Sequence, residues 1–191
     1  MYLYLYEGED VRGKAGELLV KQALAMYIAE EGREEPESMP EILRTENGKP
    51  YFEGEGLPYF SVSHSGQLWV CLMAEFPVGI DIQEETKADI KGIAERYFSQ
   101  DEKVYADIYD REGFYRLWTY KEAYTKLRGE SIFENVSKTS LIDDDSLVKS
   151  LNDDQFGEVY FKDVEIGAGI TLSVCVAKDE DIWLRLLEQQ I

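Results

Sequence analysis

One acidic residue stands out because it interrupts an apolar run. The segment Val78-Gly79-Ile80-Asp81-Ile82-Gln83 has strand-like alternation, so Asp81 and Gln83 project from one face and the isoleucines project into the core. A buried acid is costly unless it is paired or bound to a cation, and Mg²⁺ commonly takes one or two carboxylates together with substrate phosphates. The segment predicts either a divalent-cation ligand at Asp81 or a strand-end acid in solvent.

A second acid lies within an amphipathic helical pattern. Trp118, Glu122 and Lys126 are spaced i, i+4 and i+8, so they share one helix face. This face favours Glu122 as a second metal ligand and Lys126 as a phosphate contact, with Lys121 able to reach the same anion from the side. The alternative is an exposed Glu–Lys pair worth about 0.2–0.5 kcal/mol.

The only histidine, His64, lies between two serines at the end of a predicted strand. A single histidine excludes sites that need several His ligands. The chain has no G-x-S-x-G elbow, and neighbouring strand residues point to opposite faces, so Ser63 and Ser65 are poor candidates for a nucleophile activated by His64. A histidine that contacts phosphate fits better, and a structural turn histidine is the alternative.

A third acid, Glu102, follows Ser99 with the spacing of a helix capping box. That spacing predicts a structural role at a helix start. Glu102 is also a candidate third acid at the site, and the two roles compete for one side chain.

The surrounding pattern predicts a mixed α and β chain. Val78–Ile82 is expected to continue the sheet of the two preceding strands, and Gly129 to end the last helix. Residues 143–155 are expected to be an acidic connection, and a weak echo relates Val70-Cys71 to Val174-Cys175. Strands are predicted at 1–6, 60–64, 68–76, 78–82, 156–166 and 170–177, and helices at 11–29, 88–98, 100–110 and 112–128.

The length, composition and charge of the chain limit the classes of protein to which it can belong. The 191 residues, 44% of them hydrophobic, suit one ordinary domain or two small halves. A net charge of −19 argues against nucleic-acid binding, while basic islands at 11–21 and 111–130 indicate either a specific small anion or solvated helix faces. The two cysteines are expected to be buried free thiols. No signal peptide or membrane span is evident, so we expect a cytoplasmic protein.

Taken together, five segments carry a family resemblance. They are NGKP (47–50), FSVSHSG (60–66), VGIDI (78–82), RYFSQDE (96–102) and WTYKEAYTK (118–126). In order and spacing they resemble the 4′-phosphopantetheinyl transferases of the surfactin-synthetase-activating type. The resemblance implies an α+β, pseudo-two-fold duplicated fold, with halves 1–82 and 83–191 in one compact unit and the active site in the cleft between them.

The resemblance also implies an activity. This is the Mg²⁺-dependent transfer of the 4′-phosphopantetheine arm of coenzyme A to a serine of an apo acyl or peptidyl carrier protein, with release of 3′,5′-ADP. Mn²⁺ is the alternative metal. The expected protein is a monomer with no nucleic-acid or membrane partner.

Residue by residue, the resemblance implies three overlapping groups. The metal ligands would be Asp81 and Glu122, with Gln83 acting weakly or through water and Glu102 as a third acid. The catalytic residues would be Glu102 as general base, Glu122 and Lys126. The contacts to coenzyme A would be Arg12, Lys49, Ser63, His64, Lys121 and Lys126.

Two departures from the family pattern keep alternatives open. Many members have an acid where Gln83 stands, and longer members have a basic stretch before the first helix that is missing here. These departures would suit a catalytically weak or inactive coenzyme A-binding relative. A further alternative is an interaction module that binds partners through its acidic face.

Overall fold

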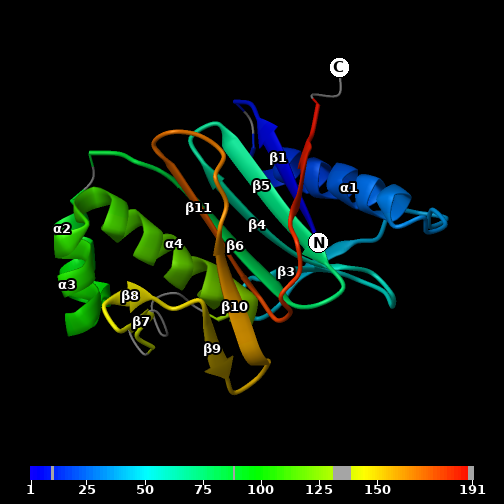
Figure 1. The fold of residues 1–191 in the computed structure, drawn as a ribbon. Helices are drawn as coiled ribbons and strands as arrows, with labels where there is room; N and C mark the ends of the chain where they lie inside the picture. Colours follow the sequence, from blue (N-terminus) through cyan, green and yellow to red (C-terminus); the bar gives the residue numbers. More distant parts are fainter. Residues whose placement is uncertain (10, 88, 131–138, 189–191) are drawn as a thin grey trace.

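Two four-stranded sheets, each packed against a long helix, organise the molecule (Figure 1). This computed structural model describes residues 1–9, 11–87, 89–130 and 139–188. The strand orders are β12-β1-β5-β4 in the first sheet and β6-β11-β10-β9 in the second. This α+β arrangement of two sheet groups is the one expected for a pseudo-duplicated fold.

The first sheet is covered by helix α1, Gly13–Glu30. Its buried face, including Leu24 and Tyr27, packs with Tyr4 and Trp69 of the sheet. The last strand of the chain, β12, pairs in parallel with β1. The strands are β1 (Tyr2–Glu7), β4 (Tyr59–Ser65), β5 (Leu68–Ala74) and β12 (Trp183–Leu186).

The second sheet is covered by helix α4, Asp110–Arg128. Gly79 of β6 permits very close packing, because a Cβ there would lie 1.9 Å from the carbonyl oxygen of Ala123 in α4. Gly129 ends the helix in the left-handed conformation at φ +68°, as predicted. The strands are β6 (Val78–Glu84), β9 (Ser150–Asp153), β10 (Gly157–Asp163) and β11 (Ile170–Val176).

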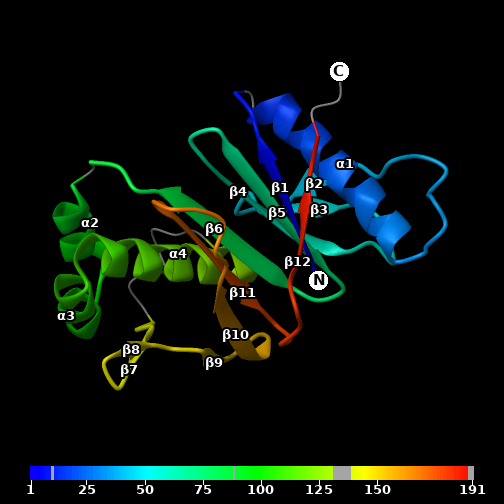
Figure 2. The ribbon, with the colours of Figure 1, turned by 45° about the horizontal axis from the view of Figure 1, so that its top comes forward.

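Shorter elements complete the two halves. Helices α2 (Ile90–Tyr97) and α3 (Gln100–Ile108) lie beside the start of α4, and α3 begins with the predicted capping box. Two hairpins are β2 (Ile42–Arg44) with β3 (Pro50–Phe52), and β7 (Ile142–Asp143) with β8 (Ser146–Leu147). In Figures 1 and 2, α1 and α4 lie on opposite sides of the molecule, with strands of both sheets between them.

The structure corrects the placement of residues 78–82. β6 does not extend the sheet of β4 and β5 but pairs along its whole length with β11, with Asp81 opposite Ser173. Its other edge is bonded by serine side chains of β4: Ser61, Ser63 and Ser65 accept from the backbone N–H groups of Ile80, Ile82 and Glu84 at 3.2, 3.4 and 2.8 Å. Hydroxyls thus replace the backbone ladder where the two sheets meet.

The segment 143–155, expected to be a connection, also contains strands. β8 and β9 lie within it, and a turn with positive φ at Asp144 and Asp145 joins β7 to β8. Asp153 accepts from the N–H groups of Gln155 and Phe156 at 2.8 and 2.9 Å. The polar side chains of this segment, which led to the prediction of an exposed connection, therefore stabilise turns between short strands.

The cysteine echo has a structural counterpart. Cys71 lies in β5 and Cys175 in β11, each an interior strand of its own sheet, and both are buried free thiols, as predicted. Burial raises the pKa of both thiols well above the usual value. In the ranges given above, no helix is both long enough and apolar enough to cross a membrane.

Candidate active site

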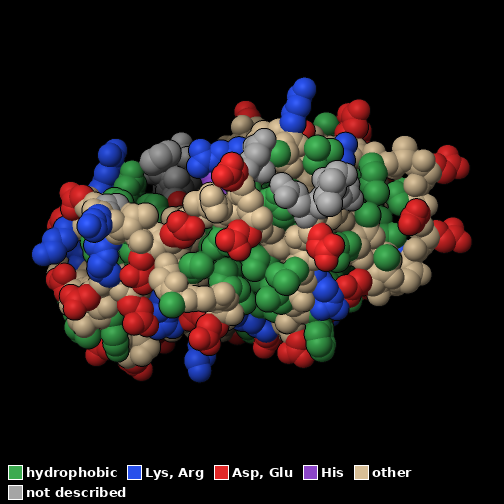
Figure 3. All heavy atoms as spheres, turned by 90° about the horizontal axis from the view of Figure 1, so that it is seen from above, with side chains coloured by type: hydrophobic (Ala, Val, Ile, Leu, Met, Phe, Trp, Pro, Cys, Tyr) green, Lys and Arg blue, Asp and Glu red, His purple; other side chains and the backbone are tan. Residues whose placement is uncertain are grey.

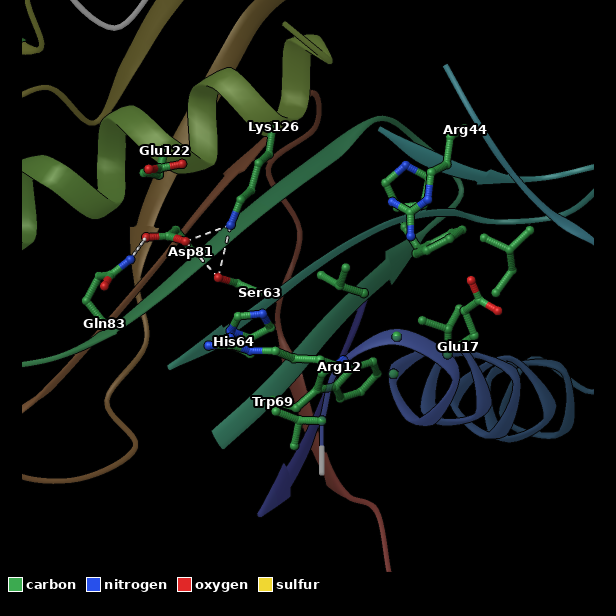
Figure 4. Close-up of a pocket in the computed structure, with 18 residues that line it drawn as sticks. Arg12, Glu17, Arg44, Ser63, His64, Trp69, Asp81, Gln83, Glu122 and Lys126 are labelled. Atoms are coloured by element: carbon green, nitrogen blue, oxygen red, sulfur yellow. Dashed lines mark hydrogen bonds and ion pairs between the residues drawn. The ribbon is translucent and has the colours of Figure 1, made fainter. Parts of the chain in front are cut away.

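A cavity of about 460 Å³ lies where the two four-stranded sheets meet (Figure 4). Its wall comes from the start of α1, from β2, β4 and β5, and from β6 and α4, so both four-stranded sheets contribute to it. The sequence places polar side chains on each of these elements: Arg12, Ser63, His64, Asp81, Gln83, Glu122 and Lys126 all line the cavity, as do residues not predicted from the sequence.

An ion pair forms one end of the cavity. Lys126 Nζ of α4 lies 2.6 Å from Asp81 Oδ1 and donates to Ser63 Oγ at 3.0 Å. Ser63 in turn donates to Asp81 Oδ1 at 2.7 Å, and Gln83 Nε2 donates to Asp81 Oδ2 at 2.9 Å. Asp81 is almost fully buried, whereas the Lys126 side chain is 29% exposed and faces the cavity. The strand prediction that Asp81 and Gln83 share one face is confirmed.

Glu122 completes this end of the cavity. Within the described part of the chain its carboxylate makes no hydrogen bond or ion pair, although Asp81 is close enough to repel it electrostatically. Burial, followed by repulsion from Asp81, raises the pKa of Glu122 to about 7, against the opposing pull of Lys126. When both carboxylates are ionised, Asp81 and Glu122 carry two negative charges and Lys126 one positive charge, so this end of the cavity has a net negative charge.

This donor set fits a hard divalent cation. Asp81 and Glu122 supply oxygen ligands from two elements, and Mg²⁺ is commonly held by one or two carboxylates with its remaining positions filled by water and phosphate oxygens. The described residues contain no cluster of three or more acidic, histidine or cysteine side chains able to hold a metal. Gln83 presents its amide nitrogen to Asp81, so its side chain acts on the ligand as a hydrogen-bond donor.

Basic side chains also line the cavity. Arg12, Arg44 and His64 are exposed side chains of its lining (Figure 4). Arg12 precedes α1, a helix with no side-chain N-cap and no acid in its first turn. Gly13, at φ +55°, leaves open space where a Cβ would stand. Free N–H groups at a helix start and nearby cations form a suitable environment for an anion.

Two residues expected at the site lie elsewhere. Glu102 and Lys121 pair with each other at 2.7 Å and are 0% and 2% exposed, and neither lines the cavity. Glu102 also accepts from the N–H groups of Ser99 and Leu141 at 2.8 and 3.0 Å. Since consecutive residues on a helix point about 100° apart, Lys121 cannot share the face of Glu122. The structure therefore does not bring the expected third acid to the metal ligands.

Lys49 is also placed away from the cavity. Its Nζ donates to the carbonyl oxygen of Leu127, in the last turn of α4, at 2.7 Å. Burial lowers the pKa of Lys49 to about 8. The structure therefore bonds the lysine of the NGKP turn to the end of α4 and does not place it in the lining of the cavity, and a phosphate contact by Lys49 stays a prediction.

Sequence reasoning missed four contributors. Arg44 and Trp69 line the cavity, and Ser61 and Ser65 join Ser63 in bonding β4 to β6. The alternation Ser61-x-Ser63-x-Ser65 was a visible signal, since it places three hydroxyls on one strand face. Arg44 had no such signal, because the short hairpin that turns it toward the cavity depends on tertiary packing.

The charge distribution agrees with a site for a small anion. Acidic side chains are spread over the face seen in Figure 3, whereas Lys and Arg side chains gather in a few places, one of them beside the histidine. For a chain of net charge −19, this local grouping concentrates positive charge at one place.

Comparison of the sequence with known proteins identifies the family. The sequence profile of the 4′-phosphopantetheinyl transferase superfamily matches residues 77–175, which is more than half of the chain and includes β6 and α4. The chain belongs to this superfamily, and the resemblance predicted from the motifs is confirmed.

Individual relatives extend the match into the first half. 4′-Phosphopantetheinyl transferase Sfp of Bacillus subtilis (strain 168) is 32% identical over 154 residues, covering 75% of this chain and 67% of the relative. 4′-Phosphopantetheinyl transferase gsp of Aneurinibacillus migulanus is 31% identical over 134 residues, covering 68% and 53%. AcpT of Escherichia coli (strain K12) is 38% identical over 108 residues, covering 53% and 55%. The matches span about half to two thirds of these relatives.

Proposed function

We propose that the cavity binds coenzyme A and that the protein transfers the 4′-phosphopantetheine arm to a serine of an apo acyl or peptidyl carrier protein. The observation that supports this proposal is that one cavity is lined by two kinds of charged groups. Asp81, Glu122 and Lys126 are suited to a cation and a diphosphate, while Arg12 and His64 are suited to a further phosphate.

Mg²⁺ would be held by Asp81 and Glu122, where it would neutralise the diphosphate and the charge that develops in the transition state. Mn²⁺ takes similar oxygen ligands. Gln83 holds Asp81 through the bond to Oδ2 and so fixes the direction of the other carboxylate oxygen. A neutral amide here leaves the site one negative charge below that of relatives with an acid.

The reaction would form a bond between the carrier serine Oγ and the β-phosphorus of coenzyme A, and break the bond from that phosphorus to the oxygen of 3′,5′-ADP. Lys126 Nζ, already within 3.0 Å of both Ser63 and Asp81, is placed to donate to the departing phosphate oxygen. Positioning and charge stabilisation supply most of the acceleration in this type of chemistry.

Glu102 is an unsuitable general base in this arrangement. Its two oxygens are engaged by Lys121, Ser99 and Leu141, and its side chain is fully buried. We propose that the Glu102–Lys121 pair acts on the reaction only through the placement of α3 against α4. Asp81 and Glu122 must be deprotonated to hold the cation, so the proton of the carrier serine would pass to solvent in the cavity rather than to either carboxylate.

The direct test is incubation of the protein with coenzyme A, Mg²⁺ and a panel of apo carrier proteins, followed by mass spectrometry of the carriers. A gain equal to the phosphopantetheine arm supports the proposal. Binding of coenzyme A without any carrier modification would support the inactive relative instead. Absence of both binding and transfer would favour an interaction module and would overturn the proposal.

A further inference from the structure

A second cavity, of about 620 Å³, lies beside the second sheet. It is bordered by α3, α4, β8 and β10, which lie together on the side of the molecule away from α1 (Figure 1). Its lining shares no residue with that of the candidate active site. Although α4 contributes to both cavities, Arg116 and Tyr120 project about 120° around the helix from Glu122 and Lys126. The two cavities are therefore separate.

Arg116 lines this cavity in an orientation fixed by an aspartate. Its Nη2 donates to Asp163 Oδ2 at 2.6 Å, and the same carboxylate accepts from the hydroxyls of Tyr120 and Ser173 at 3.4 and 3.2 Å. The Arg116 side chain is 37% exposed. A guanidinium carries five N–H donors in one plane, so the edge of Arg116 that is not turned to Asp163 can donate to an oxyanion.

Tyr105 brings a buried hydroxyl without a partner to the cavity. The residue lines the cavity and is only 5% exposed, and within the described ranges its hydroxyl makes no hydrogen bond. Among the same residues, only the Tyr4 hydroxyl is both sealed from solvent and unpartnered, so the Tyr105 hydroxyl is still accessible. An unmade hydrogen bond at a buried group is costly, and an acceptor on a ligand in the cavity would satisfy it.

Positive charge exceeds negative charge in the lining. The three cations Arg116, Lys149 and Lys162 oppose the two acids Asp163 and Asp179, which leaves one net positive charge in a chain of net charge −19. Lys162 Nζ lies 2.6 Å from Asp179 Oδ1. Lys149 is exposed and has no acidic partner among the residues that the structure describes. The cavity is therefore suited to a ligand with a single negative charge.

Aromatic rings form the apolar part of the wall. The ring centroids of Tyr105 and Tyr109 lie 4.7 Å apart, and Tyr120 stacks on Phe161 at 5.1 Å. Tyr109 is 51% exposed, so its ring is available to a flat apolar group. Sites for small molecules commonly have volumes of about 300–1,000 Å³ and combine apolar walls with a few polar groups, as this cavity does.

We propose that this cavity binds a small organic carboxylate with a flat apolar body. The carboxylate accepts from Arg116, Lys149 and the Tyr105 hydroxyl, and the body of the ligand lies against the ring of Tyr109. The inference is independent of the proposed transfer reaction, because none of these residues lines the candidate active site.

Benzoate is a suitable probe, because it combines one negative charge with one flat ring. Benzamide has the same shape without the charge, and inorganic phosphate has charge without a ring. Each is titrated into the protein at pH 7 while the amide chemical shifts are followed by NMR. We expect benzoate to shift amides of residues 105–120 and 146–163 saturably, with a Kd on the order of 1 mM, and to bind at least about tenfold tighter than benzamide or phosphate.

Three variants test the assignment of the donors. Lys149→Met should weaken benzoate binding about fivefold, and Tyr105→Phe, which keeps the packed ring, should weaken it about threefold. Lys103→Met is the matched control, because it removes a cation of α3 that pairs with Glu95 at 2.7 Å and does not line the cavity. Its Kd for benzoate should stay within about twofold of wild type.

Four results would overturn the inference. They are the absence of saturable shifts with benzoate, binding of benzamide or phosphate as tight as that of benzoate, equal weakening by Lys149→Met and Lys103→Met, and displacement of benzoate by coenzyme A. Equal weakening would reduce the effect to general charge attraction, and displacement would place benzoate in the candidate active site. The measurement requires no carrier modification, so failure of the proposed function leaves this test intact.

Discussion

Two lysine–carboxylate pairs on α4 lie five residues apart and have different surroundings. Lys126 and Asp81, 2.6 Å apart, join α4 to β6 at the edge of the cavity, and the lysine is 29% exposed. Lys121 and Glu102, 2.7 Å apart, join α4 to α3 in the interior, and both are almost completely buried. Burial lowers the pKa of Lys121, against the pull of Glu102.

Both lysines are paired with a carboxylate, so pairing does not distinguish them. What differs is that the Lys126–Asp81 pair is in contact with solvent and available to a ligand, whereas the Lys121–Glu102 pair is not. The buried pair is saturated: Glu102 accepts two backbone N–H groups as well as the ammonium, and Lys121 donates to the Thr139 carbonyl oxygen at 3.0 Å. The cavity pair is next to an acid that has no partner among the described residues, Glu122. Only the second arrangement leaves charge to be neutralised by a ligand.

The largest expected effect tests the cavity pair. Asp81→Asn should lower kcat/KM for transfer by about 10³-fold or more, because it removes a ligand of the cation and the counter-charge of Lys126. Glu122→Gln should show a comparable loss. Carrier modification followed by mass spectrometry measures both. Near-wild-type transfer in either variant would mean that this end of the cavity does not hold the reacting diphosphate.

The buried pair should respond in stability instead. Lys121→Met should lower the free energy of unfolding by about 3–5 kcal/mol, because Glu102 would be left charged and buried without its cation. Glu102→Gln should retain measurable transfer when folded. The double variant Lys121→Met/Glu102→Leu should recover much of the loss in urea titrations. If the Lys121→Met protein had normal stability but no transfer activity, Lys121 would instead be a residue of the active site.

Lys49 extends the comparison to a half-buried lysine with no carboxylate partner among the residues that the structure describes. Its folded pKa of about 8 lies below the ordinary 10.5, so between these values the unfolded chain binds more protons and stability rises with pH. We expect this rise to contribute about 2 kcal/mol between pH 8 and pH 10.5, after allowance for partial exposure. Lys49→Met should lack that component in urea titrations across this range, and identical pH profiles would contradict the assignment.

The smallest effect concerns the cap that also orients Glu102. Ser99→Ala should cost about 1 kcal/mol of unfolding free energy, since it removes the acceptor for the Glu102 N–H at the start of α3. Transfer should remain within about twofold of wild type. If a folded Ser99→Ala protein lost more transfer activity than this, the face of α4 that packs against Glu102 of α3 would take part in the reaction.

Short-range patterns in the sequence predicted the helices α1 to α4, the six strands β1, β4, β5, β6, β10 and β11, and part of the site, but not the shorter strands. The period-two pattern around Asp81 and the i, i+4 spacing of Glu122 and Lys126 fix side-chain directions locally, and those predictions agree with the structure. Which strands pair depends on contacts between residues far apart in the sequence, so the pairing of β6 with β11 could not be predicted from local patterns.

The same cause explains why two of the predicted site residues do not line the cavity. Lys49 and Glu102 occur in segments that resemble the family motifs, but their contacts depend on which helix lies opposite them. Lys49 meets the end of α4, and Glu102 meets Lys121 on the face of α4 turned away from the cavity. A motif identifies the residue type at a position, whereas its partner is decided by packing.

The central claim is that Asp81 and Glu122 together hold a divalent cation against the diphosphate of coenzyme A. It is tested most directly by calorimetric titration of coenzyme A into the protein at pH 8, above the pKa of Glu122, with Mg²⁺ and then with the metal chelated. The account predicts at least about tenfold tighter binding with Mg²⁺ for wild type, and no such gain for Asp81→Asn or Glu122→Gln. Equal affinity of the wild-type protein with and without Mg²⁺ would contradict it.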